Sequence, residues 1–282
     1  MKKRLPAQAG TFYADTEGAL RTQIQQSFLH PLGPRALPTI PGTRNQNLLG
    51  LIVPHAGYRY SGPIAAHSYY HLAQSGIVES VVILGPNHTG LGSGVSTMIE
   101  GEWSTPLGDV PIDTDLAREI VDSSDLVDVE EEAHRNEHSI EVQLPFLQFI
   151  YPRRFKFVPI CMMLQDLKTS IELGETIAKA VEKHRAAVLA SSDWTHYEPQ
   201  AEAESKDKQA IEAALRMDEK RFQEIIEERS VSACGYGPVT AMIHAAKLHG
   251  AKSGNLLSYQ TSGDITGDKS AVVGYAAASF EK

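Results

Sequence analysis

The chain has 282 residues, of which 42% are hydrophobic and 22% charged, and its formal net charge at pH 7 is -9. This composition excludes an intrinsically disordered chain, because it supplies enough apolar side chains for a core. The negative charge argues against non-specific nucleic-acid binding, and no apolar run approaches the roughly 20 residues of a transmembrane helix. We therefore expect neither nucleic acid nor a membrane as a partner.

The first predicted element is an amphipathic helix over residues 15–29, in which Leu20, Ile24 and Phe28 recur at four-residue spacing. A proline-rich link follows it. Continuous apolar runs then predict strands that are covered on both faces, as in a parallel sheet: 48–53, 80–84, 155–161 and 186–190. Helical patterns lie between these strands, near residues 63–74, 114–123, 137–150 and 167–184. This alternation predicts a doubly wound α/β protein.

The last third of the chain begins with a highly charged stretch over residues 201–229, which predicts helix with a solvated face. A further helix is predicted over 238–249, and strands over 256–260 and 271–280 flank a polar loop. The chain has no internal repeat and no long linker. We therefore expect one domain over residues 1–282, a three-layer αβα fold with a mostly parallel central sheet.

The cysteine content and the N-terminal residues bear on the compartment. Two cysteines, Cys161 and Cys234, are too few for a disulfide framework, which favours a reducing environment. The basic start of the chain is not followed by the apolar stretch of a signal peptide. We expect a cytoplasmic protein.

Histidines follow the strongest predicted strands. Strand 48–53 leads to His55, strand 80–84 to His88, and strand 186–190 to Asp193 and His196. Ligands of open parallel sheets bind beyond the carboxyl ends of the strands, so these four side chains should meet at one edge. A single histidine after a strand is usually structural, but three such loops favour a site.

Imidazole and carboxylate groups at one edge indicate a metal site for zinc or iron. Two histidines and one carboxylate suit non-haem Fe(II), while a thiolate shifts the preference toward zinc or copper. Cys234 could supply that thiolate, because it stands before a predicted helix start, where the helix dipole lowers a thiol pKa. Cys161 lies inside an apolar strand and is expected to be buried and inert.

A second group of candidates lies around the predicted helix 137–150. His134, His138 and Glu141 are spaced by four and three residues, which would place them on one helical face. His138 and Glu141 could orient a metal ligand or act as acid/base groups. The alternative, that they serve only in packing, is equally open. The other motifs expected of common enzymes are absent: Walker loop, dinucleotide glycine fingerprint and nucleophile elbow.

Taken in order, the motifs of the chain resemble those of the Memo family, whose microbial members are called AmmeMemoRadiSam system protein B. The matching segments are Arg4-Leu5-Pro6, Ala9-Gly10, Phe12-Tyr13, Pro54-His55-Ala56-Gly57-Tyr58, Gly85-Pro86-Asn87-His88, Glu137-His138-Ser139-Ile140-Glu141, Ser191-Ser192-Asp193 with His196, Cys234-Gly235, and Gly263-Asp264 through Val273-Gly274-Tyr275. Each motif is weak alone, but their order is specific and covers nearly the whole chain.

The resemblance implies a fold similar to class III extradiol dioxygenases, which hold Fe(II) with two His and one Glu and cleave catechols with dioxygen. It implies His55 and His88 as metal ligands, with Cys234 where those enzymes have a carboxylate. Asp193 and His196 would line the same pocket, with His196 as the general base. The implied cofactor is a divalent metal, Fe(II) or copper, with zinc as the remaining option.

Four functional hypotheses follow. The first is a redox-related metal-binding protein with protein partners in an AmmeMemoRadiSam-type system. The second is an active non-haem iron dioxygenase or oxidoreductase that acts on a small-molecule substrate. The third is a zinc hydrolase with His196 or Glu141 as base, and the fourth is a metal-free hydrolase that uses Cys234 and His196.

Overall fold

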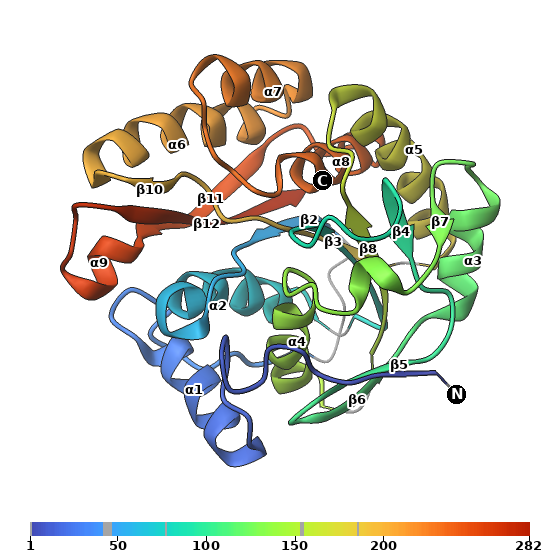
Figure 1. Ribbon diagram of the computed structural model, residues 1–282, viewed down its shortest axis with the longest axis horizontal. Coiled ribbons are helices and arrows are strands. Elements are labelled where there is room, and N and C mark those ends of the chain that lie inside the picture. Colours follow the sequence, from blue (N-terminus) through green and yellow to red (C-terminus); the bar gives the residue numbers. More distant parts are fainter. Residues whose placement is uncertain (1, 42–46, 77, 153–154, 185) are drawn as a thin grey trace.

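The computed structural model describes residues 2–41, 47–76, 78–152, 155–184 and 186–282. A nine-stranded sheet runs through its middle, in the order β10-β12-β2-β9-β3-β8-β4-β7, with β11 also paired to β12 (Figure 1). Its strands are β2 (Leu48–Val53), β3 (Ser80–Pro86), β4 (Val95–Thr97), β7 (Asp128–Val129), β8 (Lys156–Met162), β9 (Ala187–Ser191), β10 (His196–Glu198), β11 (Gly254–Thr261) and β12 (Val272–Glu281). The four central strands β2, β9, β3 and β8 are mutually parallel. Antiparallel pairings flank them, β12 with β2 on one side and β4 with β8 on the other.

Helices cover both faces of the sheet (Figure 1). One face carries α1 (Glu17–Leu29), α2 (Tyr58–Gln74) and α4 (Leu144–Ile150). The other carries α3 (Thr114–Asp122), α5 (Leu167–His184), α6 (Gln200–Leu215), α7 (Glu219–Glu228) and α8 (Tyr236–Leu248). The short α9 (Ser262–Thr266) lies between β11 and β12. The predicted α/β class with helices on both sides of a central sheet is confirmed, and the parallel pairing is concentrated at its centre.

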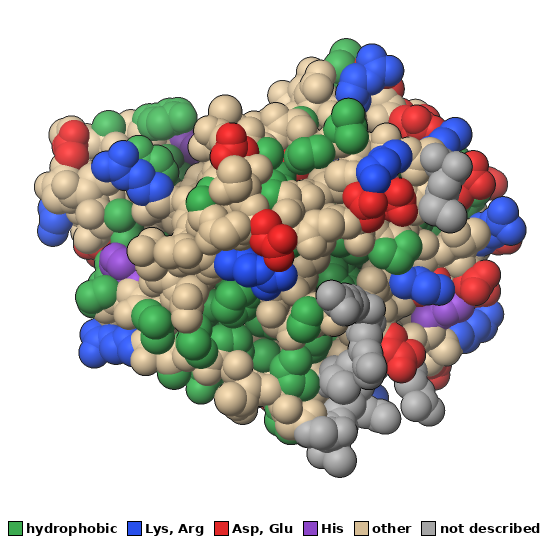
Figure 2. All heavy atoms as spheres, turned by 90° about the horizontal axis from the view of Figure 1, so that it is seen from below, with side chains coloured by type: hydrophobic (Ala, Val, Ile, Leu, Met, Phe, Trp, Pro, Cys, Tyr) green, Lys and Arg blue, Asp and Glu red, His purple; other side chains and the backbone are tan. Residues whose placement is uncertain are grey.

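A second, three-stranded sheet lies beside the main one and includes the N-terminal residues. It consists of β1 (Lys3–Arg4), β5 (Glu102–Thr105) and β6 (Gly108–Pro111), with β1 parallel to β5. Acidic and basic side chains are interspersed on the face seen in Figure 2. In the three-stranded sheet, Lys3 of β1 forms an ion pair with Asp109 of β6 at 2.6 Å. None of the helices in the described ranges combines the length and the apolar character needed to cross a membrane.

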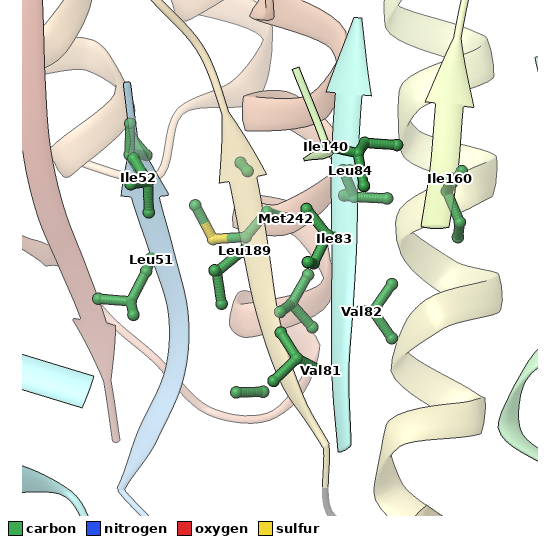
Figure 3. Packing of buried hydrophobic residues seen from close by; sticks show 14 of the residues in the cluster. Leu51, Ile52, Val81, Val82, Ile83, Leu84, Ile140, Ile160, Leu189 and Met242 are labelled. Atoms are coloured by element: carbon green, nitrogen blue, oxygen red, sulfur yellow. The ribbon is translucent and has the colours of Figure 1, made fainter. Parts of the chain in front are cut away.

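The core explains why the central strands have no polar alternation. Every residue of β3 is buried, because α8 and its neighbours pack on one face of the sheet and the α2–α4 side packs on the other. Leu84 and Ile83 of β3 lie among Leu189 of β9, Met242 of α8 and Ile140 (Figure 3). Strands that are buried on both faces are almost continuously apolar, and the few polar side chains in them, such as Ser80 and Ser191, are hydrogen-bonded. The same burial fixes where each strand ends, and therefore where the polar loops begin.

The helix predicted near residues 137–150 was wrong in its extent. Residues 137–150 do not form one helix: a 3-10 turn spans Glu141–Gln143, and α4 begins at Leu144. The Glu137 carboxylate accepts the backbone N–H groups of His138 and Ser139, which holds this part of the chain in a local turn instead. Pro145, which has no N–H to donate, stands in the first turn of α4.

The charged stretch over residues 201–229 is helical, as predicted, and is divided between two helices. α6 ends at Leu215, and Met217 has a left-handed backbone with φ of 57°. Asp218 then caps α7 by accepting the N–H of Arg221. The break turns the chain, so that α6 packs on β12 while α7 contacts α8.

Candidate metal centre

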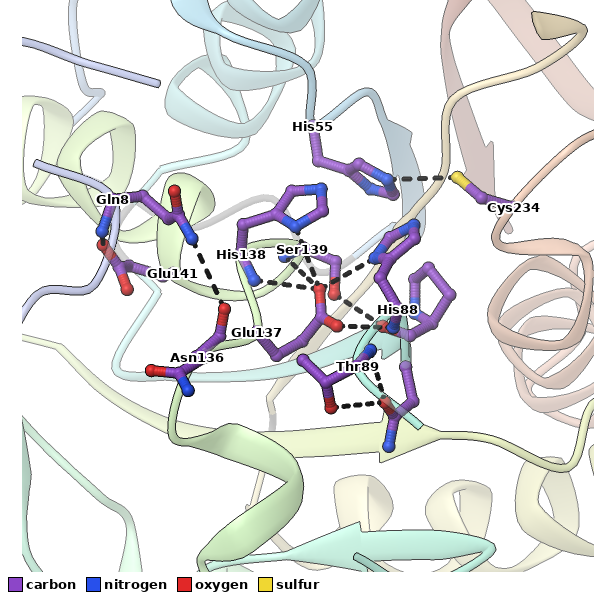
Figure 4. Close-up of polar contacts among 12 residues, drawn as sticks. Gln8, His55, His88, Thr89, Asn136, Glu137, His138, Ser139, Glu141 and Cys234 are labelled. Atoms are coloured by element: carbon purple, nitrogen blue, oxygen red, sulfur yellow. Dashed lines mark hydrogen bonds and ion pairs between the residues drawn. The ribbon is translucent and has the colours of Figure 1, made fainter. Parts of the chain in front are cut away.

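The candidate site lies at the carboxyl ends of the central parallel strands. His55 follows β2, His88 follows β3 and Asp193 follows β9, and Cys234 stands just before α8. The Sγ atom of Cys234 lies 3.0 Å from Nε2 of His55. Figure 4 shows the His55, His88 and His138 rings gathered beside this sulfur. The structure thus brings together loops that are far apart in the sequence.

The Cys234 sulfur reaches His55 because Gly235 packs against the end of β9. A Cβ atom at Gly235 would come within 2.3 Å of the Ser191 carbonyl oxygen, so any larger residue would push this segment away. The Gly235 N–H also donates to Ser192 Oγ at 3.1 Å. Glycine is therefore required after Cys234 for a steric reason, because it lets the thiol reach the edge of the sheet.

The tautomer of His55 is set by a buried hydrogen-bond chain. Ser191 Oγ donates to the Ser139 carbonyl at 2.7 Å and accepts from Gln143 Nε2 at 2.8 Å. With its one proton used, this hydroxyl accepts from His55 Nδ1, which lies 2.8 Å away. Nδ1 therefore carries the proton, and the Nε2 lone pair faces Cys234. Burial, together with the neighbouring imidazoles, lowers the pKa of His55 well below its usual range, so the ring is neutral at pH 7.

His88 is oriented in the same way by a carboxylate. Its Nδ1 lies 2.9 Å from Glu137 Oε1, and its backbone N–H donates to Glu137 Oε2 at 2.6 Å. Although burial raises the pKa of Glu137, the hydrogen bond from His88 and the nearby imidazoles outweigh it and lower that pKa to about 2. The ionised carboxylate accepts the Nδ1 proton, which leaves Nε2 of His88 free to bind a ligand.

Two groups of side chains meet the distance requirement for a shared metal ion within the described part of the chain. One ligand atom from each of His55, His88 and Cys234 lies within 4.8 Å of the others, and the same holds for His88, Glu137 and His138. The second group is the poorer metal site, because the Glu137 oxygens already accept hydrogen bonds from His88 and from backbone N–H groups. Glu137 instead orients His88, which belongs to the first group.

The thiol of Cys234 differs from what its position before a helix suggested. Burial raises its pKa well above the usual value, and the charge of Asp193 adds to the effect. The expectation that the helix dipole would lower this pKa was wrong for the metal-free site, because desolvation outweighs the dipole. A metal that binds here must displace the thiol proton.

Asp193 connects the β9 loop to both neighbours. Its Oδ1 accepts the backbone N–H of His55 at 2.8 Å, and its own N–H points to Cys234 Sγ at 3.3 Å. Burial raises the pKa of Asp193 to about 7, although the N–H groups of His55 and Ala56 oppose the rise. The carboxyl group thus changes its charge near neutral pH, next to the sulfur.

His138 and His196 stand at the margin of this centre. The His138 ring stacks on His88 at 4.4 Å between centroids, and burial lowers its pKa to about 4. His196 has Nδ1 2.9 Å from the Ser232 carbonyl, to which it donates, so its Nε2 is left unprotonated. Burial lowers the pKa of His196 as well. Both rings are therefore neutral at pH 7.

Comparison with known proteins identifies the family. A family model described as "Memo-like protein" matches residues 4–279. The chain belongs to the Memo family. It is 52% identical to a MEMO1 family protein of Methanocaldococcus jannaschii and 51% identical to one of Methanopyrus kandleri, over 99% of each chain in both cases. A MEMO1 family protein of Sulfurisphaera tokodaii is 49% identical over 98% of this chain and 99% of its own.

The Memo family chain also resembles a solved structure of low sequence identity. An uncharacterized protein from Escherichia coli K12 matches with a TM-score of 0.55 at 14% identity, over 82% of this chain and 99% of that one. At this identity the likeness concerns the fold alone.

Glu141 does not join the candidate centre formed by His55, His88 and Cys234. Its carboxylate faces the N-terminal segment, where it pairs with Arg4 Nη1 at 2.6 Å and accepts from Tyr13 Oη at 2.6 Å. The backbone N–H groups of Ala7 and Gln8 also donate to it. The two carboxylate oxygens of Glu141 therefore accept from four donors, and they hold the N-terminal segment in place.

The spacing predicted that His134, His138 and Glu141 share one helical face. This prediction was wrong for His134. It is fully buried at the end of a 3-10 turn, with its ring 5.6 Å from Trp103. Burial lowers its pKa to about 4. The ring belongs to the core beside the N-terminal strand β1.

We expect His134→Phe to make the protein more resistant to acid. Between pH 6.5 and about 4 the unfolded chain protonates His134 while the folded chain does not, so folding stability falls as the pH falls. The gap between 6.5 and about 4 corresponds to roughly 3 kcal/mol. Urea unfolding of wild type and His134→Phe at pH 7 and pH 4.5 measures this loss of folding stability. His138, whose pKa is also lowered, is present in both proteins, so its effect is the same in each. An equal loss of stability in variant and wild type would contradict the prediction.

The residues that orient the imidazole rings of His55 and His88 were not predicted as site residues. Glu137, Ser191 and Gln143 hold the two imidazoles through buried hydrogen bonds. The available signal was the position of Glu137 beside His138 and of Ser191 two residues before Asp193. Neither position alone indicates a partner 49 or more residues away in the chain.

Proposed function

We propose that this Memo family chain binds a redox-active divalent metal, copper or iron, through His55 Nε2, His88 Nε2 and Cys234 Sγ. The observation that carries the proposal is the pair of hydrogen bonds on the two Nδ1 atoms, to Ser191 and to Glu137. Each bond directs the lone pair of its imidazole toward the same sulfur. Metal-binding histidines usually have such a partner on the second nitrogen.

The donor set bears on the choice of metal. Two imidazoles with one thiolate form a softer set than two imidazoles with a carboxylate, so copper gains relative to Fe(II). Bound copper or iron would supply one-electron chemistry at this position. The chain itself supplies the buried setting, the fixed tautomers, and the Asp193 N–H that points to the sulfur.

A second candidate function is oxidation of a small substrate, as in an extradiol-type dioxygenase. His196 favours it, because its neutral ring holds Nδ1 on the Ser232 carbonyl and keeps Nε2 free to accept a proton. Oxygen uptake with a panel of catechols under Fe(II), in wild type and His196→Ala, tests this activity. A zinc hydrolase with Glu141 as base fits less well, since that carboxylate is occupied by Arg4. A metal-free cysteine hydrolase is disfavoured by the raised thiol pKa of Cys234.

The setting of the protein is part of the proposal. Cys161 and Cys234 are free thiols, which fits a reducing cytoplasm. We propose the cytoplasm as the location, residues 1–282 as one domain, and protein partners in an AmmeMemoRadiSam-type system. The last point depends on family membership, and co-purification with such partners from the native cell would test it.

Metal analysis of untagged protein tests the central claim. We expect wild-type protein to retain copper or iron in a near-stoichiometric amount, and His88→Ala to lose it. His71→Ala is the matched control, because His71 also pairs with a glutamate, Glu281, but belongs to α2 and not to the centre. If wild type holds no more copper, iron or zinc than His88→Ala, the metal-binding proposal is wrong.

A further inference from the structure

We propose that residues 3–13 are a built part of the metal centre, and that Phe12 is a positioning residue that holds His138 against His88. The inference deepens the proposed function, because it concerns the same site. It also gives a role to the N-terminal segment, which lies far from the histidines in sequence and contains none of the proposed ligands.

The first step is the contact between aromatic rings. The Phe12 ring lies 4.6 Å from His138, and His138 stacks on His88 at 4.4 Å with an interplanar angle of 24°. Within the described part of the chain, the His138 ring has no hydrogen bond like that of His88, and its Nδ1 has only the longer contact of 3.3 Å with Glu137 Oε1. The ring of His138 therefore keeps its orientation largely by packing between its neighbours.

The position of His138 matters to the proposed ligand His88. Both rings have Nδ1 near the same oxygen, Glu137 Oε1, at 2.9 Å for His88 and 3.3 Å for His138. If His138 moves closer, it competes for the carboxylate lone pair that keeps the His88 proton on Nδ1. By packing on His138, Phe12 protects the hydrogen bond that frees the Nε2 atom of His88.

The backbone of Phe12 is tied to the loop of the other imidazole ligand. Its carbonyl oxygen accepts the N–H of Tyr58, the first residue of α2, at 2.8 Å. This helix begins three residues after His55. Phe12 thus contacts the His55 loop through its backbone and the His138 ring through its side chain.

Glu141 and Arg4 anchor the segment that carries Phe12. The buried carboxylate of Glu141 holds Arg4, Ala7, Gln8 and Tyr13, on either side of Phe12. Arg4 also donates through Nη2 to the backbone carbonyl of Glu137 at 2.8 Å. The segment therefore holds the peptide of Glu137 as well as the ring beside it.

The test compares Phe12→Leu with Phe12→Tyr, using Phe149→Leu as a control. Leucine keeps an apolar side chain at position 12 but removes the ring, whereas tyrosine keeps the ring. Phe149 stacks on Phe28 at 5.7 Å, outside the centre. We expect the Phe12→Leu variant to bind Co(II), used alone as the probe, about 10- to 100-fold more weakly than wild type. Phe12→Tyr and Phe149→Leu should bind it like wild type.

A second readout does not depend on any metal. In the metal-free protein, the Nδ1–H resonance of His88 should shift in Phe12→Leu and match wild type in Phe12→Tyr, because only loss of the Phe12 ring lets His138 compete for Glu137 Oε1. Wild-type resonances and wild-type Co(II) affinity in Phe12→Leu, with a thermal destabilisation like that of Phe149→Leu, would reduce Phe12 to a core residue and overturn the inference. If wild type itself binds no Co(II), the resonances alone decide the role of Phe12, and the metal analysis for copper and iron still decides the proposed function.

Discussion

Replacing Arg4 with Met should lower the free energy of unfolding by roughly 3–5 kcal/mol, the cost of breaking a buried ion pair. Residue Arg4 is 8% exposed, and its guanidinium pairs with Glu141 at 2.6 Å and lies 4.1 Å from the centre of the Trp103 ring. It also donates to the carbonyls of His134 and Glu137. Methionine fills part of the volume but leaves a buried carboxylate without its cation.

Urea unfolding at pH 7 measures the loss, and two further variants separate its causes. The double variant Arg4→Met/Glu141→Gln should be more stable than Arg4→Met alone, because the uncompensated charge is gone. Arg21→Met is the matched control, since Arg21 pairs with Glu17 on an exposed helix face and should lose less than about 1 kcal/mol. A loss for Arg4→Met as small as that of the control would show that the pair is not structural.

Replacing Cys234 with Ser should weaken metal binding by roughly 100-fold or more. Structural zinc sites with three or four side-chain ligands bind with about 10–16 kcal/mol, so one ligand contributes on the order of 3 kcal/mol. A neutral hydroxyl is a far poorer ligand than a thiolate for copper, iron or zinc. Cys161→Ala is the control, because Cys161 is buried inside β8 and should not affect affinity.

The pH dependence of the same affinity gives a second signature. Burial raises the thiol pKa of Cys234 well above 9, so the thiol is protonated between pH 6 and 8 and must lose its proton to the solvent on binding. Apparent affinity should therefore rise about tenfold per pH unit from this group. Asp193, with a pKa of about 7, is present in wild type and in Cys234→Ser, so its effect on the pH dependence of the affinity is the same in the two proteins. Cys234→Ser should lower the slope by about one, and equal slopes would mean that the sulfur is not a ligand.

The central strands could be predicted because their physical requirement is local. Strands β3 and β9 are covered on both faces, so nearly all their positions are apolar, and such runs are visible in the sequence. The topology rule for parallel sheets then places the following loops, with His55 and His88, at one edge. Strand β4 escaped prediction because Ser96 and Thr97 are buried polar residues, and Thr97 is satisfied by the Pro159 carbonyl, which only the fold brings near.

The support of the site could not be predicted for the same reason. The carboxylate of Glu141 resembles an acid/base candidate until the N-terminal segment is placed on it. Ser191 resembles an ordinary loop residue until His55 and Gln143 are seen to share its hydroxyl. Spacing shows which side chains can share a face, whereas these hydrogen bonds depend on how distant segments pack.

His55 and Cys234 touch across 179 positions of sequence. During synthesis, His55 and His88 leave the ribosome long before Cys234 does. Parallel pairing of β2 with β9, and the approach of Gly235 to β9, must then be complete before the three donors meet. The donor set is therefore a late product of folding, and an ion bound there would act as a cross-link over a very long loop, closing the chain in the way a disulfide does. An ion that binds there would therefore need a nearly finished fold, and a partner that delivers it would have to recognise that fold.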